Sequence, residues 1–215
     1  MNIVLIGPQG SGKGEQAKRL IEKFNLAYFS AGDLLRDLAG EESGQGKVIH
    51  HLMNVEGKLI PDEIMNKLVF DKLNEIDWKN GLLFDGFPRT QHQFAELEKY
   101  LTSKAEKVDR LIYLKIKPQT SISRLTSRRI CPKCKTIYNL VTDRPKEDEK
   151  CDKCGLKLVQ RLDESPQAIE NRLKSYYELT EPLIDQARKE GLLEEIDGEK
   201  PIGEVFQEIV EKLPQ

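Results

Sequence analysis

The segment Gly7-Pro8-Gln9-Gly10-Ser11-Gly12-Lys13 decides the fold, and it directly follows a short apolar run at residues 2–6. Such a run is typical of a buried parallel strand. The segment matches the start of the pattern G-x-x-x-x-G-K-[ST], whose glycines let backbone N–H groups converge on phosphate oxygens. A helix predicted over 13–23 would direct the positive end of its dipole at the same point, and Lys13 would add a cation for the β and γ phosphates. The sequence therefore predicts a phosphate-binding loop between a strand and a helix.

The position after Lys13 departs from this pattern, because it holds Gly14 rather than Ser or Thr, and Glu15 follows. The hydroxyl that usually contacts Mg²⁺ is missing, so the metal would have to be held elsewhere, through water. A carboxylate at Glu15 should repel the phosphates of a nucleotide unless an arginine or the metal neutralises it. We therefore expect Glu15→Thr to lower the KM for ATP.

Strands and helices alternate along most of the chain. Four further strands are predicted at 27–30, 81–84, 111–116 and 192–196. Helices are predicted at 31–38, 47–55, 90–101, 168–189 and 202–213, with two more beginning at Pro61 and Pro118. This order predicts an α/β fold of three layers, in which helices cover both faces of a central parallel five-stranded sheet.

The bulk composition limits the classes of protein. A chain of 215 residues has room for one sizeable core, and 34 Lys+Arg against 36 Asp+Glu gives a net charge of −2. Nucleic-acid binders are usually basic overall. No apolar run approaches the ~18 residues that a membrane span needs, and residues 1–7 resemble a strand rather than a signal peptide. We expect a cytoplasmic monomer with no nucleic-acid or membrane partner.

Segment 130–160 differs from the rest of the chain in composition: it is rich in lysine, contains two prolines and shows no helical spacing of apolar residues. Its cysteines form two close pairs, Cys131 with Cys134 and Cys151 with Cys154, separated by sixteen residues. This spacing is typical of zinc sites, and four thiolates would leave no open position, so the zinc would be structural. Disulfides are disfavoured without a secretory signal. A zinc ribbon that binds nucleic acid is the competing interpretation, and the position of the segment inside a phosphate-loop sheet favours a lid.

The strand predicted at 81–84 is followed by an acidic residue, Asp85, and then by Gly86-Phe87-Pro88-Arg89. The carboxyl end of a buried strand lies beside the phosphate loop in this type of sheet. Asp85 could hold the water shell of Mg²⁺, and the planar guanidinium of Arg89 suits a phosphate group.

Three motifs in order, at 7–14 with Gln16, at 30–36, and at 85–90 with Gln93, resemble the adenylate kinase family of nucleoside monophosphate kinases. The cysteine segment resembles the lid of the long-lid, zinc-bearing bacterial type. The resemblance implies a core at 1–29, 61–126 and 165–215, a small helical flap that binds the nucleoside monophosphate at 30–60, and a zinc-stapled lid at 127–164. It also implies reversible phosphoryl transfer from MgATP to AMP, giving two ADP.

The resemblance assigns the AMP site residue by residue. Arg36 and Arg89 would grip the phosphate, Gln93 would read the adenine edge, and the bond between Phe87 and Pro88 would be cis. The implied set is Ala31, Arg36, Lys58, Leu59, Ile60, Gly86, Phe87, Pro88, Arg89, Gln93, Arg161 and Arg172.

The ATP side and the catalytic groups follow from the same resemblance. The implied ATP contacts are Gly10, Ser11, Gly12, Lys13, Gly14, Glu15, Arg128, Ile137, Tyr138 and Lys200. The implied catalytic groups are Lys13, Asp85, Arg89, Arg124, Arg128, Arg161, Asp163 and Arg172, with Asp33 and Asp85 around the waters of Mg²⁺.

Histidine chemistry does not enter this interpretation, since His50, His51 and His92 have no obvious nucleophile partner. A monophosphate acceptor is already ionised at neutral pH, so positioning and charge stabilisation suffice. Two alternatives remain open. Ala31 resembles the UMP/CMP kinases, although Gln93 and the long lid favour AMP. Alternatively, Glu15 marks a nucleotide-binding protein whose catalysis has lapsed.

Overall fold

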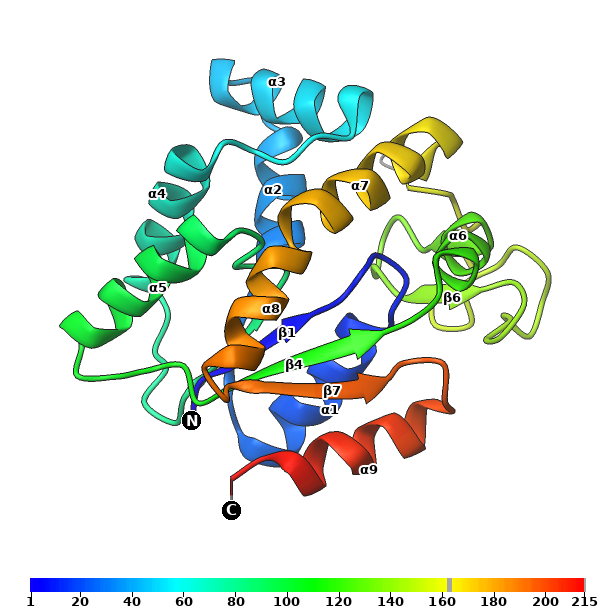
Figure 1. Ribbon diagram of the computed structural model, residues 1–215. Helices are drawn as coiled ribbons and strands as arrows, with labels where there is room; N and C mark the ends of the chain where they lie inside the picture. The colour runs from blue at the N-terminus through cyan, green and yellow to red at the C-terminus, as the bar shows by residue number, and fades with distance from the viewer. Residues whose placement is uncertain (162–163, 215) are drawn as a thin grey trace.

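The computed structural model describes residues 1–161 and 164–214 (Figure 1). Five strands form one parallel sheet in the order β2-β3-β1-β4-β7, and they are β1 (Ile3–Ile6), β2 (Ala27–Ser30), β3 (Leu82–Asp85), β4 (Arg110–Lys115) and β7 (Leu193–Asp197). This arrangement confirms the predicted central sheet.

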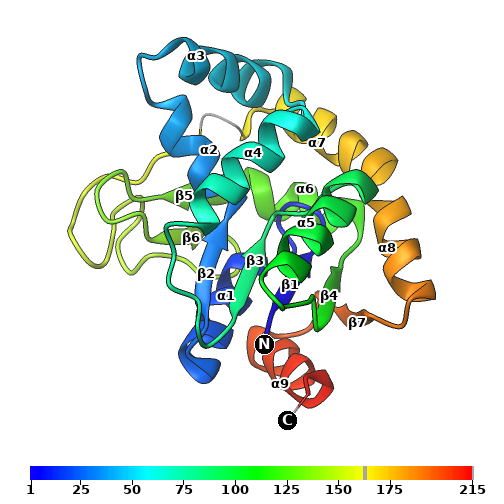
Figure 2. The same ribbon diagram turned by 90° about the vertical axis from the view of Figure 1, so that its left-hand side faces the viewer.

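The two faces of the sheet are covered by different helices, because successive side chains of a strand point to opposite faces. On one face, Val4 and Ile6 of β1 pack with helices α4 (Asp62–Leu73), α5 (Gln91–Ser103) and α8 (Glu181–Lys189). On the other face, Ile3 and Leu5 pack with α1 (Lys13–Phe24) and α9 (Ile202–Lys212). The two views show the sheet between these layers, which confirms the three-layer α/β architecture (Figures 1 and 2).

The helical segment after β2 differs in detail from the prediction. It contains α2 (Ala31–Ala39), α3 (Gly44–His50) and a π-helix, η1 (His51–Glu56). The helix predicted at 47–55 therefore begins earlier, where the Ser43 side chain accepts a hydrogen bond from Gly46 N, and changes its period at His51. It ends at Gly57, whose positive φ of 63° allows Lys58 N to bond to Leu52 O at 3.0 Å.

The single helix predicted at 168–189 was wrong, because the structure has two helices there. Helix α7 (Pro166–Leu179) ends before Thr180, and α8 begins at Glu181 with Pro182 in its first turn. Proline has no N–H to donate, and its ring would clash with the carbonyl one turn earlier, so it kinks or breaks a helix, and here the chain starts a new one. In the described part of the chain, no helix has both the length and the apolar character needed to cross a membrane.

The cysteine-bearing segment folds as a separate small module beside α6 (Pro118–Thr126). Strands β5 (Arg128–Ile130) and β6 (Ile137–Asn139) form an antiparallel pair, and Ile130 also bridges to Val159. Its own buried cluster consists of Cys131, Tyr138, Cys151 and Leu158. These residues belong to neither of the two clusters that line the sheet, so the module has a core of its own.

Candidate active site

The loop after β1 is shaped by backbone contacts. Gly7 lies so close to β4 that an added Cβ would be 2.6 Å from Leu114 O, which requires glycine. Ser11 N donates to Pro8 O at 3.2 Å, and α1 begins after Gly12, whose φ is 93°. The predicted phosphate loop is therefore a tight turn that leads directly into the N-terminus of a helix.

The Lys13 ammonium lies across this loop. Its Nζ donates to Gly7 O at 2.7 Å and to Pro8 O at 3.0 Å. Burial, together with the positive charges of Arg89, Arg128 and Arg172, lowers the pKa of Lys13 to about 8, against the opposing effect of Asp85. The structure thus brings Lys13 together with arginines from three other parts of the chain.

Arg89 belongs to the same cluster of cations. Its Nε donates to Gly86 O at 2.9 Å. Burial lowers the pKa of Arg89 to about 10, assisted by the nearby charges of Arg172 and Arg36 and opposed by Asp85. Like charges gathered at a buried place repel one another, and a bound anion would relieve this repulsion.

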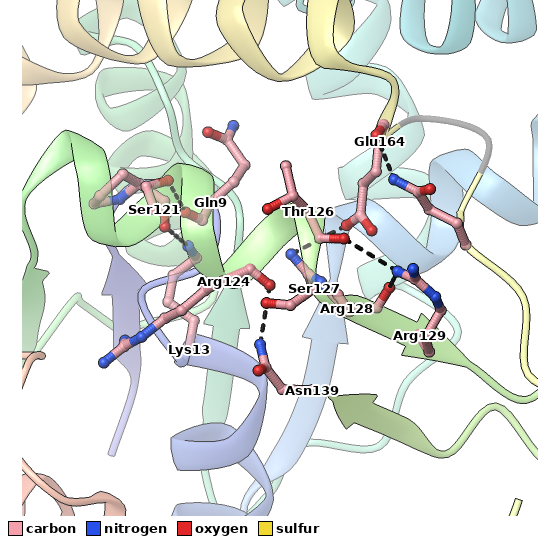
Figure 3. Close-up of polar contacts among 12 residues, drawn as sticks. Gln9, Lys13, Ser121, Arg124, Thr126, Ser127, Arg128, Arg129, Asn139 and Glu164 are labelled. Carbon is pink, nitrogen blue, oxygen red and sulfur yellow. Dashed lines mark hydrogen bonds and ion pairs between the residues drawn. The ribbon is translucent and has the colours of Figure 1, made fainter. Parts of the chain in front are cut away.

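Two arginines approach the loop from the side of the cysteine module (Figure 3). Arg124 on α6 donates to Gly10 O at 3.2 Å and to Gly198 O at 3.1 Å, so one guanidinium joins α6, the phosphate loop and the turn after β7. Arg128 forms an ion pair of 3.1 Å with Glu164, whose side chain is 1% exposed. Sequence reasoning missed Glu164, because only the tertiary fold brings it to Arg128.

Two carboxylates lie beside the cations. A Cβ added to Gly14 would be 3.9 Å from Asp85 Oδ2, which places Asp85 next to the loop. The Tyr28 hydroxyl donates to Asp85 Oδ2 at 3.2 Å, a contact that sequence reasoning missed. Partial burial raises the pKa of Asp33, but its 2.6 Å bond to Arg36 and the charge of Arg161 bring it below its usual value. Ionised oxygens of this kind suit the water shell of Mg²⁺.

A pocket opens between α2, the segment after η1, and the end of β3. It is lined by Ala31, Gly32, Leu35, Arg36, Met53, Lys58, Leu59, Ile60, Met65, Gly86, Arg89, Gln93 and Arg172. Most of the residues that the sequence assigned to AMP therefore meet around one cavity. The apolar Leu35, Met53 and Met65 were missed, since no motif distinguishes them from ordinary core positions.

Three residues of the expected AMP set do not line this pocket. The Phe87 side chain is wholly buried and packs edge-on against Phe29 and Phe70, at ring distances of 6.5 and 6.4 Å. Pro88 follows it through a cis peptide bond, as the family resemblance implied. Arg161 lies outside the lining of the pocket, and its positive charge lowers the pKa of Asp33.

Some expected ATP contacts have side chains that are occupied elsewhere. Glu15 forms ion pairs with Arg19 at 3.3 Å and with Lys18 at 3.6 Å, and these exposed cations offset only part of its charge. Lys200 Nζ pairs with Glu208 at 2.7 Å. Ile137 is 38% exposed, whereas Tyr138 points into the cysteine module, where its hydroxyl accepts from Asp152 N at 2.9 Å. Asp163 lies outside the described residues.

The four cysteine sulfurs meet at one point. Cys131 and Cys154 are 3.2 Å apart, Cys134 and Cys151 are 3.4 Å apart, and all four sulfur atoms lie within 4.8 Å of one another. A zinc ion about 2.3 Å from each sulfur of a tetrahedron separates the sulfurs by about 3.8 Å. The donor set and its spacing therefore fit a structural zinc site.

A glycine-rich loop with its lysine, set between a parallel strand and a helix at the carboxyl edge of the sheet, defines the class of P-loop nucleotide-binding proteins. A family model described as adenylate kinase matches residues 5–192. The chain therefore belongs to the adenylate kinase family, as its motifs indicated.

Relatives with this name are similar over almost their full length. The chain is 40% identical over 213 residues to an adenylate kinase of Caldanaerobacter subterraneus subsp. tengcongensis, covering 99% of this chain and 96% of the relative. It is 41% identical over 209 residues to one of Thermotoga neapolitana (97% and 94%), and 40% identical over 209 residues to one of Archaeoglobus fulgidus (97% and 96%).

Proposed function

We propose that the protein is an ATP:AMP phosphotransferase that reversibly moves a phosphoryl group from MgATP to AMP, giving two ADP. One observation carries the proposal: the phosphate loop and the pocket share a single cluster of cations. Arg89 and Arg172 line the pocket, and their charges also lower the pKa of Lys13 in the loop. Two nucleotides bound at these places would have their phosphates facing each other.

ATP would occupy the loop side. Backbone N–H groups from Gly10 to Gly14, together with Lys13, would bind its phosphates, and Glu15, Arg128, Ile137, Tyr138 and Lys200 would contribute further contacts. AMP would occupy the pocket, with its phosphate held by Arg36, Arg89 and Arg172. Lys58, Leu59 and Ile60 would lie along the nucleoside, near Ala31 and the turn formed by Gly86, Phe87 and Pro88.

The chemistry needs no general base, because the attacking phosphate oxygen of AMP is already ionised. Charge on the transferred group would be stabilised by Lys13, Arg89, Arg124, Arg128, Arg161 and Arg172, and the family resemblance adds Asp163 to the catalytic groups. Asp33 and Asp85 are the residues that would hold Mg²⁺ through water, and the ion would supply additional positive charge to the phosphates of ATP.

The two excursions from the sheet would close over the substrates and exclude water, which would otherwise hydrolyse ATP. We assign the AMP-binding flap to 30–60, the lid to 127–164 and the core to the remaining segments; lid closure in adenylate kinases is a known example of such a motion. The cysteine cluster would hold structural zinc. Thiols gathered as metal ligands favour a reducing cytoplasm, and we propose a monomer there.

A coupled assay for ADP formation tests this function. Wild-type protein should convert AMP faster than CMP, UMP or GMP with MgATP, and Lys13→Met should abolish the reaction. Lys23→Met, which removes an exposed lysine from the last turn of the same helix, is the matched control and should retain it. If CMP or UMP reacts faster than AMP, the protein is a pyrimidine nucleotide kinase, as Ala31 alone would suggest. If ADP does not form while ATP still binds, the protein is a nucleotide-binding protein without this activity.

A further inference from the structure

Asp62, the first residue of α4, accepts hydrogen bonds from two residues at the start of α5, one of which, Gln93, lines the pocket. The Thr90 hydroxyl donates to Asp62 Oδ2 at 2.6 Å, and Gln93 Nε2 donates to Asp62 Oδ1 at 2.7 Å. On its other side, Gln93 Oε1 accepts a hydrogen bond from Arg89 N at 2.7 Å. Both ends of the Gln93 amide are therefore bound, and the residue is only 2% exposed.

The two partners of Gln93 allow one orientation of its amide. A carboxylate can only accept hydrogen bonds, and a backbone N–H can only donate one. Turning the amide over would place the Gln93 NH₂ group against Arg89 N–H and its oxygen against the Asp62 carboxylate, so both bonds would become repulsive. In the permitted orientation, one N–H and one oxygen lone pair of the amide remain for a ligand, in a fixed order.

The rest of the pocket shows where this amide would act. Arg36, Arg89, Arg172 and Lys58 supply a cationic region suited to a phosphate. Gln93 is the only neutral amide side chain among the lining residues that the structure describes, and the other neutral residues offer apolar side chains or glycine backbone. A nucleoside monophosphate whose phosphate lies among the cations would place its base toward the apolar part, where Gln93 is the polar group that can distinguish bases.

We propose that Asp62 is a specificity-determining positioning residue, which holds Gln93 so that the pocket accepts a base with an amino group beside an unprotonated ring nitrogen. Adenine and cytosine present this edge. Guanine, hypoxanthine and uracil present an oxo group beside a ring N–H, which is the reverse order of donor and acceptor. The inference rests on the proposed function for the placement of the acceptor nucleotide, and it leaves adenine and cytosine to be distinguished by size.

The sharpest probe is the pair AMP and IMP, which differ only in this edge of the base. Wild-type protein should favour AMP over IMP in kcat/KM by at least about a hundredfold, since a site built to bond one pattern leaves its groups unpaired with the other. Asp62→Asn replaces an acceptor with a carboxamide of the same shape that can also donate. It should reduce the AMP/IMP ratio by about tenfold, the worth of one bond to a charged group, with the KM for ATP unchanged.

Glu63→Gln is the matched control. It removes an exposed carboxylate from the same first turn of α4 but does not touch Gln93, so the AMP/IMP ratio should stay as in wild type. Equal use of AMP and IMP by wild-type protein overturns the inference without any variant, and so does an unchanged ratio in folded Asp62→Asn. Calorimetric titration of wild-type protein and of Asp62→Asn with AMP and with IMP measures the ratio without turnover, and the ratio should fall in the variant. Absence of ADP formation alongside tight, selective AMP binding would therefore refute the proposed function and still support the role of Asp62.

Discussion

Loss of zinc should unfold the cysteine module while leaving the sheet intact. The perturbation is Cys134→Ser, which removes the one ligand whose residue is exposed and should therefore disturb packing least. The module should depend on a metal because its buried cluster, among the residues that the structure describes, contains only Tyr138 and Leu158 besides cysteines.

The magnitudes favour a large local effect. Burial of Tyr138 and Leu158 contributes about 1.5–3 kcal/mol each, whereas a structural zinc site contributes on the order of 10–16 kcal/mol to folding. A bound zinc ion would thus be the dominant stabilising contribution to this module. The sheet has separate clusters on its two faces, built around residues such as Phe84 and Leu83, and these do not include the cysteine module.

Limited trypsin digestion and thermal denaturation together provide the assay. Cys134→Ser should be cut rapidly within 130–160, its activity should fall by at least about tenfold, and its main melting transition should shift by less than about 4 °C. Lys133→Ser, an exposed substitution in the same loop, should behave as wild type. A zinc-free variant that resists trypsin and retains full activity would refute the reasoning.

Three other outcomes are expected. Since the pKa of Lys13 is lowered to about 8, Lys13 loses its charge as the pH rises through that value. The value of kcat/KM for ATP should therefore fall above about pH 8. In Lys13→Arg, provided that the variant retains activity, kcat/KM should stay level over the same pH range. Glu15→Thr should lower the KM for ATP, whereas Arg19→Ala, which removes the ion pair between Arg19 and Glu15, should raise it. Steady-state kinetics in low salt measures both changes, and a KM that moves in the opposite direction in either variant would contradict the prediction. Leu97→Ala, in the core of the sheet layer, should cost about 2–5 kcal/mol in guanidinium unfolding with both KM values unchanged, and a cost below 1 kcal/mol would contradict its assignment to the core.

The repeating elements could be predicted from the sequence because they are encoded locally. The apolar runs that become β1 and β3, and the glycines before Lys13, each reveal their structure within a few residues. The break between α7 and α8 was also marked locally, by Pro182, but the apolar spacing on both sides concealed it. The π-helix that begins at His51 had no such signal.

The contacts that set the chemistry could not be predicted in the same way. Tyr28 reaches Asp85 across neighbouring strands, and Gln93 reaches Asp62 between two helices. Each contact joins residues far apart in the chain, so it depends on the packing of the whole sheet rather than on spacing within a motif. Motifs could therefore predict Arg89 and Gln93 as residues of the candidate site, and both line the pocket, but motifs could not show what holds them in place.

The two bonds of Arg124 have a mechanical consequence. The Arg124 guanidinium donates hydrogen bonds to the carbonyl oxygens of both Gly10 and Gly198. A tilt of α6 would therefore break these bonds or displace the phosphate loop. A movement of the cysteine module that tilts this helix would therefore be transmitted to the phosphate loop.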